Sequence, residues 1–301
     1  MIRRLSMMVW SALVLLAPPS LIAAEPAEPA RKPILKVGVT LHPYYSWTRN
    51  VVGDAPIEVR SILPGEVDAG NYQPTQADIQ RLADLDAIVV NGVGHDDFIR
   101  DMIKASGNTK LLVITPSEGT PMIRSVRGAA INSHTFISIT NAIQQTYAIE
   151  KALSGLRPEL AATFRKNASG YAQRLRAIKA RAAAELAKAK ITRVVTVHDG
   201  YSYLMQELGI DIAGVVEPAH GLVPSAKELG ELIELLKREG IKTIFSEESF
   251  PEPLLRVVKE SAGARVYIIS HVATGAYTAD KFEKEMTRNV ESMIQALVRD
   301  G

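Results

Sequence analysis

Residues 159–190 constrain the fold more than any other part of the chain, because they form a long segment almost without helix breakers. The segment is rich in Ala, Arg, Lys and Leu, and Gly170 is its one weak point. An α-helix rises about 1.5 Å per residue, so a helix of roughly thirty residues would extend about 45 Å. We therefore predict one long, rigid helix across residues 156–190.

Short β-rich runs alternate with helical patterns on both sides of this segment. The first half has predicted strands at residues 35–40, 57–63, 87–91 and 111–115, and helices at 76–85, 96–105 and 137–153. The second half has strands at 193–197, 212–216, 242–246 and 265–269, and helices near Tyr203 and at 226–239, 252–261 and 279–298. Such alternation favours parallel sheets with crossover helices. The expected fold class is α/β, with two lobes at residues 34–155 and 191–301 joined by the long helix.

Residues 1–24 have the layout of a cleavable secretion signal. Arg3 and Arg4 precede a short apolar core, and the small residues Ala23 and Ala24 end the segment. The core is shorter than the roughly 20 residues that a membrane-spanning helix needs. Residues 25–33 are Pro-rich and charged, which predicts a disordered lead-in. We expect a periplasmic protein; an N-terminal membrane anchor is the less favoured alternative.

Charge and cysteine content exclude several classes of protein. The formal net charge of +2 falls to 0 once Arg3 and Arg4 leave with the signal, so the mature chain has no electrostatic reason to bind nucleic acid. The chain has no cysteine, which excludes disulfides, thiolate metal ligands, a Cys nucleophile and a lipid-modified cysteine. We expect a soluble monomer.

Four of the six histidines fall where a predicted strand ends or a predicted helix begins. They are His198 after residues 193–197, His271 after 265–269, His95 after 87–91 and His134 before 137–153. Ligands of parallel α/β sheets bind at the carboxyl ends of the strands. Neutral imidazole is a common ligand for zinc and also suits iron, copper and nickel. The joint placement of these histidines predicts a metal site between the lobes.

Short motifs occur in one order along the chain: Asp68-Ala69-Gly70-Asn71-Tyr72, Asn91-Gly92-Val93-Gly94, Asn132-Ser133-His134, Val195-Thr196-Val197-His198-Asp199 and Ile244-Phe245-Ser246-Glu247. The series resembles the periplasmic substrate-binding proteins (cluster A-I) of zinc, manganese and iron ABC importers. The resemblance runs from about residue 34 to residue 300. It implies a metal bound between two lobes and delivery to an inner-membrane ABC permease.

Two ligands carry over from the resemblance directly, namely His134 and His198. At the position of His198 the zinc-type members have His, whereas the manganese-type members have Glu. The resemblance therefore favours zinc, and iron(II) and manganese are the alternatives.

The chain departs from the family pattern at two ligand positions. The family's first ligand, a His, falls on Gly70, and its last ligand, an Asp, falls close to Ser270. We expect His271 to replace that Asp and His95 to reach in for the missing His. Asn71 or a water molecule could also fill that gap. The family's histidine-rich loop is absent, because residues 120–130 contain no His.

Several alternatives stay open at this point. The site could bind a metal chelate such as a siderophore–metal complex, or the chain could be a metallochaperone, acting alone or beside another periplasmic protein. A zinc hydrolase is less favoured, because the chain has no His-Glu-x-x-His, Gly-x-Ser-x-Gly or phosphate-binding Gly-rich motif. Other polar residues have lesser expected roles: packing for His42, orientation of an imidazole for Glu247 and Glu248, and peripheral positions for Glu217 and His220.

Overall fold

The computed structural model describes residues 34–301 except Arg127, Ala129 and residues 218–221. The predicted signal and lead-in at residues 1–33 lie outside the described residues, as does His220. Residues 34–301 form one compact unit. We call the parts built around its two sheets the first and second lobes, and the lobe boundaries stay predictions. Among the described residues, no helix is both long and apolar enough to cross a membrane.

The first lobe contains a four-stranded parallel sheet. Its strands are β1 (Leu35–Val39), β2 (Ile57–Ser61), β3 (Ala87–Val89) and β4 (Leu112–Ile114), in the order β2-β1-β3-β4. Its helices are α1 (His42–Val52), η1 (Ala69–Asn71), α2 (Gln76–Gln80), α3 (Ile99–Ser106) and α4 (Ile139–Leu156).

The second lobe repeats the same strand order. Its parallel sheet is ordered β6-β5-β7-β8, from β5 (Arg193–Thr196), β6 (Asp211–Val215), β7 (Thr243–Ser246) and β8 (Arg265–Ile268). Its helices are η3 (Asp199–Tyr201), α6 (Ser202–Glu207), α7 (Ala226–Glu239), α8 (Glu252–Ala262), α9 (Lys281–Ile294) and η4 (Gln295–Arg299). Because both sheets are parallel, the carboxyl ends of the strands carry the loops that can bind a ligand.

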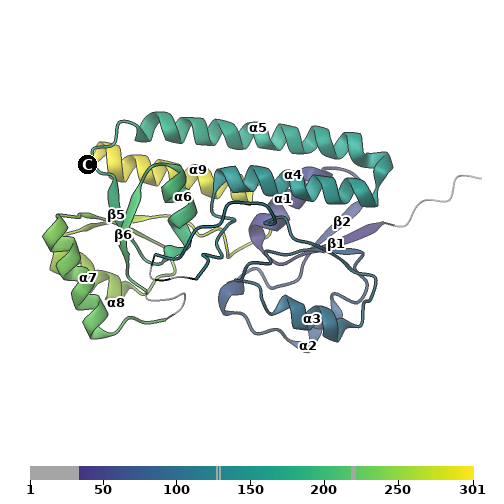
Figure 1. The fold of residues 1–301 in the computed structure, drawn as a ribbon, viewed down its shortest axis with the longest axis horizontal. Coiled ribbons are helices and arrows are strands. Elements are labelled where there is room, and N and C mark those ends of the chain that lie inside the picture. Colours follow the sequence, from purple (N-terminus) through teal and green to yellow (C-terminus); the bar gives the residue numbers. More distant parts are fainter. Residues whose placement is uncertain (1–33, 127, 129, 218–221) are drawn as a thin grey trace, which may run out of the picture. The chain divides into compact units, whose positions relative to one another are not determined.

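The predicted long helix is present and joins the two lobes. After the short turn η2 (Pro158–Leu160), α5 (Ala161–Leu186) continues for 26 residues without a break at Gly170. It runs along one side of the molecule above α4 and α9 (Figure 1). Its buried residues, which include Phe164, Tyr171 and Leu175, lie on the side that packs against α1, α4 and α9.

Helix α1 is the main element that the sequence did not predict. The sequence analysis gave no helix between the strands at residues 35–40 and 57–63, but His42 is the first residue of α1 and Pro43 occupies its first turn. Proline is tolerated there because the first N–H groups of a helix have no partner inside the helix. Tyr44 and Trp47 are fully buried, and Trp47 packs edge-on against Phe282 of α9. This packing outweighs the modest helix propensity of the aromatic residues.

Candidate metal centre

The four predicted histidines come together between the lobes. We call His95, His134, His198 and His271 the histidine cluster. Ring centroids are 4.9 Å apart for His95 and His134, 5.0 Å for His134 and His271, and 4.8 Å for His198 and His271. Ligand atoms of His95, His134 and His271 lie within 4.8 Å of one another. The group is compact enough to surround one metal ion.

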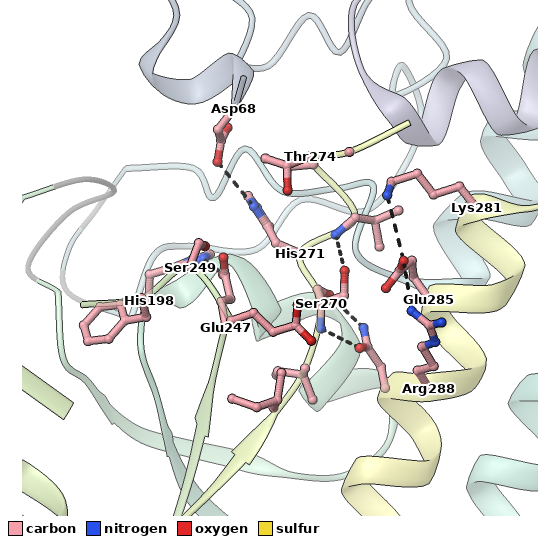
Figure 2. Close-up of a pocket in the computed structure, with 18 of the residues that line it drawn as sticks. Asp68, His198, Glu247, Ser249, Ser270, His271, Thr274, Lys281, Glu285 and Arg288 are labelled. Atoms are coloured by element: carbon pink, nitrogen blue, oxygen red, sulfur yellow. Dashed lines mark hydrogen bonds and ion pairs between the residues drawn. The ribbon is translucent and has the colours of Figure 1, made fainter. Parts of the chain in front are cut away.

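Two carboxylates adjoin the histidine cluster. An oxygen of Asp68 lies 3.3 Å from Nε2 of His95, and the other lies 3.6 Å from Nδ1 of His271 (Figure 2). Oε1 of Glu247 is 2.5 Å from Nε2 of His198, and His198, Glu247 and His271 form a second group of ligand atoms within 4.8 Å. Nitrogen and oxygen donors from both lobes therefore face one small volume.

Burial and hydrogen bonding favour the protonation states that bind metal. Burial lowers the pKa of His271, which keeps its imidazole neutral. Burial raises the pKa of Glu247, but the hydrogen bonds of its carboxylate with His198 and with the hydroxyl of Tyr201 favour the ionised form, and the pKa is lowered to about 2. Metal ions bind neutral imidazole and ionised carboxylate, so these groups are ready to act as donors at neutral pH.

One asparagine ties the two histidine-bearing loops of the first lobe together. The side-chain amide of Asn91 donates to the carbonyls of Gly94 and Ser133, both at 2.8 Å. These carbonyls belong to the residues directly before His95 and His134. His95 has a φ of 71°, a left-handed conformation that is uncommon outside glycine. We attribute the placement of both imidazoles to this bridge.

Gly200 sets the close approach of two imidazoles. His198 precedes η3, and its Nδ1 accepts the backbone N–H of Gly200 at 2.9 Å. A Cβ added at Gly200 would lie 2.4 Å from Cε1 of His198 and 3.1 Å from Cδ2 of His134. The backbone can lie this close to the rings only because residue 200 has no side chain.

Helix α9 holds the strand end that carries His271. The side chain of Asn289 accepts the N–H of Ser270 at 2.6 Å and donates to its carbonyl at 2.8 Å. Ser270 itself accepts the N–H of Val272 at 3.0 Å through its hydroxyl. Ser270 thus orders the loop, and His271 beside it faces the cluster.

Other residues from the sequence interpretation lie outside the cluster. The backbone N–H of Gly70 donates to the carboxylate of Asp68 at 2.9 Å and so helps to fix this neighbouring carboxylate. His42 is buried and its ring stacks on Tyr277 with centroids 3.8 Å apart, while Nε2 lies 2.8 Å from the carbonyl of Gly275. That is a packing role.

The sequence interpretation did not single out Asp68. The sequence does carry a signal for it, because Asp68 opens the motif Asp68-Ala69-Gly70-Asn71-Tyr72, one of those on which the resemblance to the family rests. Glu247 was anticipated only as a residue that orients an imidazole, and its carboxylate is close enough to serve as a ligand.

A cavity of about 770 Å³ opens beside the cluster. Asp68, His198, Glu247 and His271 line one part of it, and Lys281, Glu285 and Arg288 of α9 line another (Figure 2). Glu217 and Glu248 also contribute to the wall. The cavity is much larger than a single metal ion.

Comparison with known proteins identifies the family. Residues 37–296 match the family described as zinc-uptake complex component A, periplasmic (ZnuA). The chain belongs to this family. The resemblance that the sequence motifs indicated is thereby confirmed, and so is the two-lobed α/β fold.

Solved structures and curated proteins support the same assignment. The SBP FpvC from Pseudomonas aeruginosa in complex with Mn²⁺ is 40% identical and superimposes with a TM-score of 0.84, over 89% of this chain and 100% of that chain. The Ni²⁺ complex of FpvC is also 40% identical in sequence and superimposes with a TM-score of 0.83, over 89% of this chain and 98% of that chain. The zinc-binding protein AdcA of Streptococcus pyogenes serotype M3 is 24% identical over 78% of this chain. The match covers only 50% of the length of AdcA. A divalent metal is the ligand class that these proteins share.

Proposed function

We propose that this chain captures a divalent transition-metal ion at the histidine cluster and delivers it to an ABC permease. One observation carries the proposal: four buried imidazoles from separate segments, two from each lobe, converge beside the carboxylates of Asp68 and Glu247. Imidazoles held only by packing would not need to converge beside ionised oxygens. We assign no catalytic role to the site.

We propose zinc as the preferred ion, with iron(II) and manganese as alternatives. Imidazole nitrogen and carboxylate oxygen are common zinc ligands, and the family is named for zinc uptake. The donor set also suits metals with more than four ligands, because the carboxylates of Asp68 and Glu247 lie close to the four imidazoles. The Mn²⁺ and Ni²⁺ complexes of FpvC support this wider range.

Titration of the metal-stripped mature chain tests the ligand assignment. We expect one zinc ion per chain, and we expect His198→Ala and the double variant His95→Ala/His271→Ala each to raise the Kd at least tenfold, or about 1.4 kcal/mol. Glu234→Gln is the control, because Glu234 of α7 is 72% exposed and its side chain pairs with Lys237, outside the cluster. An unchanged Kd in the double variant would remove His95 and His271 from the ligand set.

The cavity beside the cluster favours a second candidate ligand, a metal chelate. Its volume of about 770 Å³ leaves room for an organic molecule around an ion held by His271 and Glu247. Native mass spectrometry of the protein isolated from its own host distinguishes the two ligands. An added mass of one metal ion supports bare-ion capture, whereas a mass larger by several hundred daltons supports a chelate.

We place the protein in the periplasm, as a monomer that serves an inner-membrane permease. Its family description as a periplasmic component of an uptake complex supports this placement. A metallochaperone that passes its ion to another periplasmic protein is the alternative. Deleting the gene and measuring uptake of radioactive zinc separates them: reduced uptake supports import, and unchanged uptake supports the chaperone role.

A further inference from the structure

A buried carboxylate of the second lobe caps a helix of the first lobe. Glu207 is the last residue of α6, and its side chain is only 7% exposed. It accepts the hydroxyl of Ser138 and the N–H of Ile139, both at 2.9 Å, and the N–H of Thr140 at 3.0 Å. The hydroxyl of Thr140 donates to the same carboxylate. These groups form the N-terminus of α4, where a negative charge is stabilised by the unpaired N–H groups and the helix dipole.

The long helix α5 completes this arrangement. Nζ of Lys179 lies 2.8 Å from Glu207 and also donates to the hydroxyl of Thr140. The carboxylate thus joins three parts of the molecule: α6 of the second lobe, α4 of the first lobe and the helix that links them. We call Glu207, Ser138, Ile139, Thr140 and Lys179 the Glu207 clamp.

A second set of contacts also joins residues 132–140 of the first lobe to residues 199–207 of the second lobe, at a distance along the chain from Glu207. The side chain of Asn132 donates to the carbonyl of Asp199 at 2.8 Å, and the hydroxyl of Tyr203 donates to the carbonyl of Asn132 at 2.9 Å. Residues 132–140 and 199–207 are therefore held together at both ends. His134 lies within the first segment, and His198 directly precedes the second.

We infer that Glu207 is a positioning residue for metal binding, which fixes His134 relative to His198 before an ion arrives. The rings of these two histidines lie 5.6 Å apart, and they come from different lobes. Without a tie between residues 132–140 and 199–207, that separation would follow every small movement of one lobe against the other. This inference rests on the proposed function, because the clamp matters for affinity only if both imidazoles bind the ion.

The chemistry of the clamp supports positioning over simple cohesion. Helices α4 and α5 already pack along their lengths, with Ile149, Leu153 and Phe164 fully buried. Burying an ionised carboxylate carries a large desolvation cost. If α6 and α4 needed only to stay together, apolar contact of the kind seen between α4 and α5 would hold them more simply. Four directional hydrogen bonds instead define one relative placement of α6 and α4.

Variants at Glu207 test the inference through the Kd for zinc and the visible spectrum of bound Co²⁺, which reports coordination geometry. Glu207→Gln keeps the shape but loses the charge and one acceptor oxygen. We expect its zinc Kd to rise about tenfold, the lower end for residues that orient metal ligands, with a changed Co²⁺ spectrum. Glu283→Gln is the matched control, because Glu283 of α9 pairs with Arg174 of α5 at 2.9 Å without contacting a histidine-bearing segment. We expect the control to keep the parent's Kd and spectrum.

A distance measurement adds a readout that needs no metal. The chain has no native cysteine, so spin labels can be placed at Arg100→Cys in the first lobe and Lys227→Cys in the second. Both side chains are well exposed, at 74% and 85%. We expect a narrow distribution of label distances in the metal-free parent and a broader one in Glu207→Gln.

A Glu207→Gln protein that keeps the zinc Kd within twofold and the narrow distance distribution would overturn the inference, even if its unfolding free energy falls. If this variant does not fold, Thr140→Val replaces it, because it removes the hydroxyl that bridges Glu207 and Lys179. Failure of the parent to bind any metal would instead contradict the proposed function, and the distance distributions would still decide whether the clamp fixes the lobes.

Discussion

At the scale of single residues, the site depends on groups that are not ligands as much as on those that are. Gly200 allows His198 and His134 to lie near the backbone of η3, and Asn91 joins the loops before His95 and His134. A substitution at Gly200 or Asn91 would therefore move the metal-binding side chains without removing any of them.

Gly200→Ala tests this point. The new methyl group would lie well inside contact distance of His198, so we expect the ring to shift and the zinc Kd to rise at least tenfold. Gly230→Ala is the control, because Gly230 lies in α7 with no atom within 4 Å of an added Cβ. Isothermal titration of both variants checks the result; equal zinc affinity of Gly200→Ala and Gly230→Ala would contradict the account.

The histidines of the site could be predicted from the sequence because each follows a strand or precedes a helix, and parallel strands bring such ends together. Asp68 could not be predicted in the same way. Its carboxylate reaches the cluster through the short turn η1, whose geometry depends on the N–H of Gly70 and on no periodic pattern.

At the scale of elements, β-rich runs located the strands well. All eight strands lie within one or two residues of their predicted limits, and α7 has its predicted limits. The helices differ more from their predicted limits. Helix α2 ends at Gln80 and not at Leu85. Helix α3 begins at Ile99 and not at Asp96, because the side chain of Asp96 accepts the N–H groups of Asn91 and Gly92. The start of α3 is thus set by local hydrogen bonds between a side chain and the backbone of the preceding loop, which no periodic pattern reveals.

Helix α5 permits a prediction about stability. Gly170 lies inside this helix with open space around an added Cβ, so Gly170→Ala should raise the unfolding free energy by roughly 0.5–1 kcal/mol. Gly240 also has open space, but its φ is 67° at the end of α7, so Gly240→Ala should lower the unfolding free energy by about 1 kcal/mol. Urea unfolding of the metal-free proteins measures both changes. A destabilised Gly170→Ala would show that the glycine is needed in α5.

At the scale of the whole molecule, the lobes are tied at more than one place. Beyond the Glu207 clamp, α1 of the first lobe contacts the segment after β8 of the second. Nε2 of His42 lies 2.8 Å from the carbonyl of Gly275, and the N–H of Gly275 donates to the carbonyl of Gly65 at 2.8 Å. The long helix and these ties favour a largely preformed site.

His42 makes this second tie sensitive to acid. Burial lowers its pKa from 6.5 to about 4, so below pH 6.5 the unfolded chain binds a proton that the folded chain does not. Its contribution to stability is therefore fully present above pH 6.5 and is lost as the pH falls toward 4, by up to about 3 kcal/mol at 1.36 kcal/mol per unit. Urea unfolding at several pH values should show a shallower acid loss for His42→Phe than for the parent. Parallel pH profiles would contradict this assignment.

The most direct test of the central claim is anomalous X-ray diffraction at the zinc edge from crystals of the zinc-loaded mature chain. We expect a single peak among His95, His134, His198 and His271, at the distance of about 2.0–2.1 Å that zinc keeps from imidazole nitrogen. A peak elsewhere on the chain, or no peak from protein shown in solution to be folded and exposed to zinc, would contradict the account.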